Sequence, residues 1–137
     1  MQPTPNRRTV LLEGYTVDEI LALPSEVLED FVFTGESVVF RVGSAEVLGE
    51  FRRGQGRLVL ELAQIEGGGE GVLPSIGALA RRYALGEGLH EIEWIVHAVS
   101  CARPNAKLRQ MLQRRGFVIR HVPGSGDAYH RVEAVRR

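Results

Sequence analysis

Glycines gather between residues 66 and 72, directly after an apolar strand-like run and before a helix-like segment. Glycine lets backbone amides turn toward a ligand, and a helix begins with unpaired N–H groups and the positive end of its dipole. The arrangement therefore predicts an anion site, and a pyrophosphate would suit it. A loop that is merely flexible is the alternative, and the motif alone does not favour either.

Two familiar phosphate motifs are excluded at this position. The P-loop requires Gly-Lys-Ser or Gly-Lys-Thr, and this segment contains no lysine. The dinucleotide-binding motif opens a parallel strand–helix–strand unit, whereas these glycines follow strands that we expect to be antiparallel.

Glu61 is the first candidate for proton transfer. Alternation along residues 57–65 places Glu61 on one face with Val59 and Ala63, opposite Leu60. A carboxylate among apolar neighbours would have a raised pKa and could act as a general base, directly or through a water. The alternative, which is the commoner situation, is a solvated carboxylate on an exposed sheet face.

Two further side chains could complete such chemistry. His97 lies in a β-branched and aromatic run, residues 91–99, and could be a base, a relay or a hydrogen-bonded structural histidine. Tyr129, on the expected last strand (128–135), is the best candidate for a general acid, although packing is the commoner role of such a tyrosine.

The lone cysteine, Cys101, excludes an internal disulfide and a cysteine-based zinc site. It has no activating neighbour in the sequence, so we expect Cys101 to be a small buried apolar side chain. The four histidines lack metal-ligand spacing, and we expect no metal.

Short elements must position these residues in the first half of the chain. The apolar run at residues 10–12 predicts a strand, and Thr16 with Glu19 forms the capping box of a helix that ends before Pro24. Ser25 is placed to cap a second short helix. Strand-like segments separated by glycine turns predict a three-stranded antiparallel meander, at residues 37–42, 45–51 and 57–65.

The second half continues with a helix over residues 72–85, which Gly86 would end in the left-handed conformation. A strand over 91–99, a helix capped by Asn105 and stopped by Gly116, and strands over 117–122 and 128–135 complete the order. The crossover through the 72–85 helix requires parallel strands, so we expect an α+β fold with a mixed sheet.

Composition limits the class of protein. The chain has 137 residues, 44% hydrophobic and 25% charged, with 17 basic and 17 acidic side chains. These values fit one domain, residues 10–137, after a flexible N-terminus, residues 1–9. No run approaches the roughly 18 apolar residues of a membrane span. We therefore expect a soluble, cytoplasmic protein without membrane or nucleic-acid partners, since nucleic-acid binders usually carry a basic surplus.

The zero net charge is a cancellation between two parts of the chain. Residues 1–100 hold 15 acidic and 8 basic side chains, and residues 101–137 hold 2 acidic and 9 basic ones. The basic side chains of residues 101–137 would form a flank that neutralises phosphates or docks an acidic partner. The alternative is an ordinary solvated helix face.

The order of elements, with its glycine turn between the fourth strand and a long helix, resembles the GNAT family of N-acetyltransferases. The family's loop, Gln/Arg-x-x-Gly-x-Gly/Ala, falls here on Glu66, Gly69 and Gly71. Its Asn and, eleven residues later, Gly-Phe fall on Asn105 and Gly116-Phe117. The resemblance covers nearly the whole chain and implies a sheet of about seven mostly antiparallel strands with helices on both faces.

The resemblance also implies a co-substrate, acetyl-coenzyme A, and transfer of its acetyl group to an amine of a small molecule or protein. Its pyrophosphate would lie on backbone amides of the loop, and its pantetheine arm would pair with the end of the fourth strand and lie beside Asn105. The residues implied are Gln64, Ile65, Gly67, Gly68, Gly69, Gly71 and Val72.

A non-catalytic binding or interaction module of this fold is the competing hypothesis. Glu66 and Glu70 place carboxylates beside the expected pyrophosphate, and Leu112 stands where the family often has its general-acid tyrosine. In either case, the last strand (128–135), if exposed, could pair with a strand of a second copy and form a homodimer.

Overall fold

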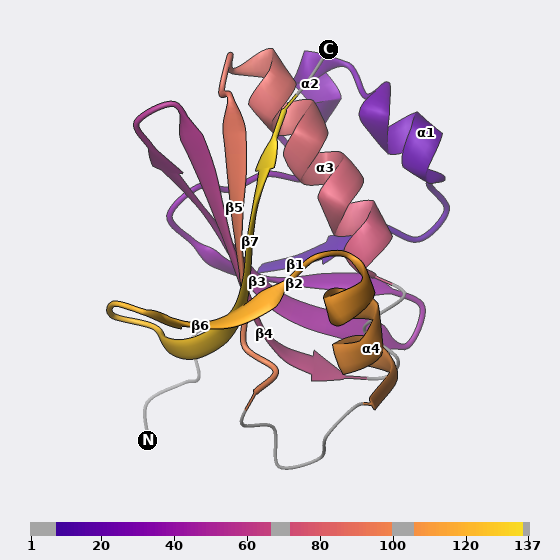
Figure 1. The fold of residues 1–137 in the computed structure, drawn as a ribbon. Coiled ribbons are helices and arrows are strands. Elements are labelled where there is room, and N and C mark those ends of the chain that lie inside the picture. Colours follow the sequence, from indigo (N-terminus) through magenta and orange to yellow (C-terminus); the bar gives the residue numbers. More distant parts are fainter. Residues whose placement is uncertain (1–7, 67–71, 100–105, 136–137) are drawn as a thin grey trace, which may run out of the picture.

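The structure is a computed structural model that describes residues 8–66, 72–99 and 106–135 (Figure 1). The described elements follow the expected order, and they are β1 (Arg8–Leu11), α1 (Val17–Leu21), α2 (Ser25–Leu28), β2 (Ser37–Val42), β3 (Ala45–Gly54), β4 (Arg57–Glu66), α3 (Leu73–Gly86), β5 (Glu91–Val96), α4 (Ala106–Arg114), β6 (Val118–Val122) and β7 (Gly126–Ala134). The α+β class with a mixed sheet is confirmed.

The first helix begins as the sequence predicts. The amide of Glu19 donates to the Thr16 hydroxyl at 3.1 Å, and the amide of Thr16 donates to the Glu19 carboxylate at 3.3 Å. This capping box pairs two amides that a helix start would otherwise leave open. The second helix differs from the expectation, because Pro24 is its N-cap and Ser25 is already its first residue.

The meander β2–β3–β4 sets the register on which the candidate site depends. Gln55 and Gly56 connect β3 to β4, and Gly54 pairs with Arg57 at the turn. Counting back along both strands then places Arg52 opposite Val59. Gly56 has a φ of +67°, a conformation that glycine adopts without steric cost.

The crossover helix α3 makes β5 run parallel to β4, as expected. Gly86 belongs to this helix, and Gly88, with a φ of +68°, is the left-handed residue after it. The expected role of Gly86 was therefore wrong, because the last turn continues until the amide of Glu87 donates to the Tyr83 carbonyl.

The strand order is β1-β2-β3-β4-β5-β7-β6, with parallel pairing in β1–β2 and β4–β5 and antiparallel pairing elsewhere. The last strand, β7, lies between β5 and β6. The expectation that it is an exposed edge is therefore wrong, and β6 is the edge strand at this end.

The described helices gather on one side of the sheet. Helix α3 covers the face of β4 that carries Leu58, Leu60 and Leu62, all fully buried, and α1 packs against α3. Side chains of α4 meet those of α3 around Trp94, on the same side. The expectation of helices on both faces is therefore wrong for the described residues. The opposite face of β3, β4 and β5 carries charged side chains, Glu50, Arg52, Glu61 and Glu93, among apolar ones such as Val59 and Ile95.

Candidate active site

The strands β4 and β5 part after a short parallel pairing. Their ladder ends at Leu62 opposite Val96, and the last bond runs from the His97 amide to the Leu62 carbonyl at 2.8 Å. Strand β4 continues to Glu66 with β3 as its partner. The backbone of β4 beyond Leu62 therefore has an edge that β5 does not pair.

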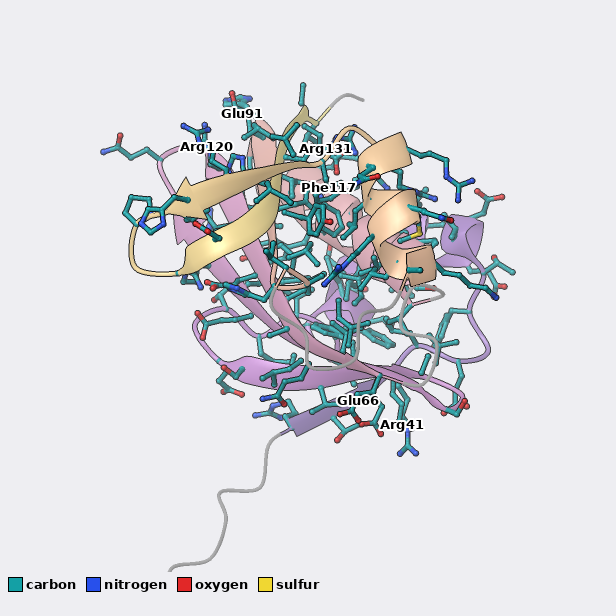
Figure 2. The ribbon with its side chains drawn as sticks, turned by 60° about the horizontal axis from the view of Figure 1, so that its bottom comes forward. Arg41, Glu66, Glu91, Phe117, Arg120 and Arg131 are labelled. Atoms are coloured by element: carbon teal, nitrogen blue, oxygen red, sulfur yellow. The ribbon has the colours of Figure 1, made fainter. Side chains whose placement is uncertain are left out.

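A bulge lies in the parted section of β4. Its pairing with β3 shifts between Ala63 opposite Leu48 and Glu66 opposite Glu46. Gln64, inside this interval, has a φ of +49°, the left-handed region that side chains other than glycine and asparagine rarely adopt. Backbone strain of this kind is frequent at functional sites. Figure 2 shows where β4 ends, with Glu66 at the same edge of the molecule as Arg41.

Glu61 and His97, two of the three predicted catalytic residues, are in contact. His97 follows β5 directly, and its Nε2 lies 2.5 Å from a carboxylate oxygen of Glu61. Both side chains are about a quarter exposed and line an open pocket of about 250 Å³ at the point where the strands part. The remaining pocket lining comes from β2, β3 and β4.

Arg52 joins Glu61 to a second carboxylate. One guanidinium nitrogen lies 2.8 Å from Glu50 and the other 2.8 Å from Glu61. Glu50 and Glu61 are directly opposite in the β3–β4 register, where two like charges destabilise a sheet. The arginine compensates both charges, and Glu50 also accepts a hydrogen bond from Ser37.

The pKa of Glu61 lies below its usual value. Partial burial by itself raises that pKa, but hydrogen bonds from His97, Arg52 and Ser125 together outweigh it. The expected raised pKa is therefore wrong, because hydrogen-bond donors reach the Glu61 carboxylate in addition to its apolar neighbours. Burial similarly lowers the pKa of Arg52, but its hydrogen bonds to Glu50 and Glu61 dominate and raise it.

Tyr129 does not join this pair. It is opposite Val96 in the β5–β7 register, and Val96 is opposite Leu62, which faces α3. The tyrosine is 3% exposed and belongs to the hydrophobic core. The expected acid therefore faces the other side of the sheet from Glu61.

The expected coenzyme-binding residues are only partly described. Gln64 is exposed, Ile65 is half-buried, and Val72 is fully buried just before α3. The loop glycines and Asn105 lie outside the described residues, as does Cys101.

A second glutamate–histidine pair lies on the same face, nearer the other end of β5. His130 Nε2 is 2.8 Å from Glu93, which Arg57 also approaches at 3.3 Å. Burial alone raises the pKa of Glu93, but His130 and Arg57 outweigh it and lower that pKa. His130 is 7% exposed, so the histidine of this pair is far less accessible than His97.

Sequence reasoning missed Arg52, Glu50 and Ser125 as parts of the site. The signal for the first two was present, since a two-residue turn at Gln55 and Gly56 fixes Glu50 opposite Glu61. Ser125 had no such signal, because the β6–β7 turn reaches Glu61 only through the tertiary fold.

Comparison with known proteins found no match among family models, curated proteins or solved structures. Among the described residues, no helix has the length and apolar character needed to cross a membrane. Within the same residues, His, Cys, Asp and Glu side chains do not gather in threes as a metal site would require.

Proposed function

We propose that this protein is an acyltransferase that resembles the GNAT family and moves an acetyl group from acetyl-coenzyme A to an amine. The observation that supports it most is the Glu61–His97 contact at the point where β4 and β5 part. A proton-accepting pair beside an unpaired strand edge is what aminolysis of a thioester requires, because the attacking amine must lose a proton.

Two features of the described residues fit an extended coenzyme. Backbone groups of β4 from Ala63 to Ile65 have no β5 partner, so an amide-containing pantetheine arm could pair with them. Helix α3 begins at Leu73 without a side-chain cap, which leaves the amides of Leu73 and Ser75 for an anion, since Pro74 between them has no N–H. When bound, acetyl-coenzyme A supplies the activated acyl group as a thioester.

Arg52, Glu61 and His97 would divide the proton transfer between them. Arg52 keeps Glu61 ionised, and the carboxylate fixes the imidazole ring and stabilises the imidazolium. The pair takes the proton of the acceptor amine as the amine nitrogen bonds to the acyl carbon. The carbon–sulfur bond then breaks, and the thiolate leaves with the bonding electrons.

One observation favours the competing hypothesis of a non-catalytic binding module. Leu112, which replaces the family's frequent tyrosine, is fully buried, and Tyr129 faces the other side of the sheet. No general acid is therefore assigned among the described residues. A binding module would take up the coenzyme, or a protein partner, without turnover.

Calorimetry with acetyl-coenzyme A and release of free thiol in the presence of a panel of amines test the proposal together. We expect binding, and turnover that falls about 100-fold or more in His97→Gln and Glu61→Gln. His121→Gln is the matched control, because His121 is exposed and pairs only with Asp127 among the described residues. Absence of binding at millimolar coenzyme would refute the proposal. Binding without turnover would support the module.

A further inference from the structure

An open cavity of about 350 Å³ lies between α2 and α3. Its volume is in the range of small-molecule sites, which is about 300–1,000 Å³. None of its lining residues lines the Glu61 pocket, and α3 lies on the opposite side of the sheet from Glu61. The cavity is therefore separate from the candidate active site.

Arg82 enters this cavity in a fixed orientation. Its Nε donates to the Leu23 carbonyl at 2.8 Å, and one Nη donates to the Ser25 hydroxyl at 3.4 Å. The other Nη has no partner among the described residues and lies against Gly86, where an added Cβ would be only 2.8 Å from it. A guanidinium held in this way is prepared for a carboxylate.

The cavity also contains an opposite charge and an apolar wall. Glu29 is exposed and has no ion-pair or hydrogen-bond partner among the described side chains, whereas Glu87 is compensated by Arg53 at 3.0 Å. Leu28 and Val32 supply apolar surface. The uncompensated charges in the lining are therefore one cation and one anion.

We propose that this cavity binds a small zwitterion, an α-amino acid with an aliphatic side chain. Arg82 would hold the carboxylate, Glu29 the ammonium group, and Leu28 with Val32 the side chain. A simple carboxylate would leave Glu29 without a partner, and a simple amine would leave Arg82 without one. The site does not involve Glu61 or His97, so the outcome of its test is independent of the acyltransferase proposal.

Calorimetry of the full chain with L-leucine, isovalerate and isoamylamine is the direct test. The last two compounds carry the same branched group with only one of the two charges. We expect L-leucine to bind about tenfold or more tightly than either half-ligand, since each loses a charge-assisted hydrogen bond. Two results would overturn the proposal. One is that L-leucine does not bind at about 10 mM, roughly the weakest affinity of use. The other is that isovalerate or isoamylamine binds as tightly as L-leucine.

Three variants locate the site on the protein. Glu29→Gln removes an exposed charge and leaves the fold intact, and Gly86→Ala keeps every charge but displaces the Arg82 guanidinium. Each should weaken L-leucine binding about tenfold, as should Arg82→Gln. Arg114→Gln, on the exposed face of α4, is the control and should bind as the parent does. Binding that survives both Glu29→Gln and Gly86→Ala would place the ligand elsewhere and refute the site.

Discussion

Arg52, together with His97 and Ser125, keeps Glu61 of the candidate site ionised. It is the cation between Glu50 and Glu61, which the β3–β4 register places directly opposite each other. Because the pKa of Glu61 is lowered in the folded chain, its ionised form stabilises the fold above the unfolded pKa, near 4.5. That contribution is lost as the pH falls through the folded pKa.

We expect Arg52→Gln to lower the free energy of unfolding by about 1 kcal/mol at pH 7, because two carboxylates then face each other without a cation. The loss should shrink as the pH falls through the folded pKa of Glu61, which lies below 4.5, because that carboxyl then takes up a proton. Urea unfolding across this pH range measures it, and carboxyl NMR titration should show a higher pKa for Glu61.

Arg53→Gln provides the control for that measurement. Arg53 is the next residue along β3 and pairs with Glu87, an exposed partner. Its removal should cost only a few tenths of a kcal/mol or less. A loss in Arg52→Gln that is the same at every pH would show that Arg52 acts by packing its side chain and not by charge.

Among the elements, β4 carries the local strain of the fold at Gln64. The side chain is exposed, so its replacement changes no packing, and the φ of +49° is the feature that a substitution tests. Left-handed backbone costs an ordinary residue roughly 1–2 kcal/mol, more for a β-branched one, and costs glycine little.

We expect Gln64→Gly to be more stable than Gln64→Val by about 1–2 kcal/mol in chemical denaturation. Gln110, an exposed glutamine inside α4, gives the matched control. There Gln110→Gly should destabilise by about 1 kcal/mol, because glycine weakens a helix interior. Equal stabilities of the two Gln64 variants would contradict a left-handed bulge in β4.

Elements could be predicted from the sequence where local chemistry decides them. The capping box of Thr16 and Glu19, the glycine turns and the alternation of β2 to β4 all act within a few residues, and their predictions are confirmed. The predicted end of α3 was wrong. Gly86 and Gly88 give the same local signal for the end of a helix, and only the backbone hydrogen bonds of the last turn decide between them. The side of the sheet on which each helix lies has no local signal at all.

At the scale of the whole molecule, one hydrophobic core joins both halves of the sheet. It includes Val10 of β1, Phe51 of β3 and Tyr129 of β7. The single tryptophan, Trp94, is 5% exposed in β5 and donates its indole N–H to Glu133 of β7 at 2.8 Å. Its fluorescence therefore reports on the second half of the sheet.

We expect the Trp94 fluorescence transition in urea to coincide with the far-ultraviolet circular dichroism transition, as in two-state unfolding. The reason is that β5 and β7 bury the same core as the meander does. The same midpoint and slope should fit both signals. A tryptophan transition at lower urea would show that β5, β6 and β7 unfold before the meander.

The candidate site could be predicted only in part, because it draws on several strands. Glu61 and His97 were found separately, from alternation and residue type, but their contact depends on the β4–β5 pairing. Tyr129 was expected on the last strand and lies there, but only the β5–β7 register decides that it faces the core and not Glu61. Sequence patterns identify the groups, and the register decides which of them meet.

The two-residue turn at Gln55 and Gly56 limits how the chain can change in length during evolution. One inserted residue there would reverse the faces of β3 relative to β4 and carry Arg52 and Glu50 away from Glu61. The turn that carries Ser125 is constrained in a similar way, by its hydrogen bond to Glu61. Gly43 and Ser44, between β2 and β3, affect the site less directly, because the register that they set places Ser37 opposite Glu50 and leaves Arg52 and Glu61 in place.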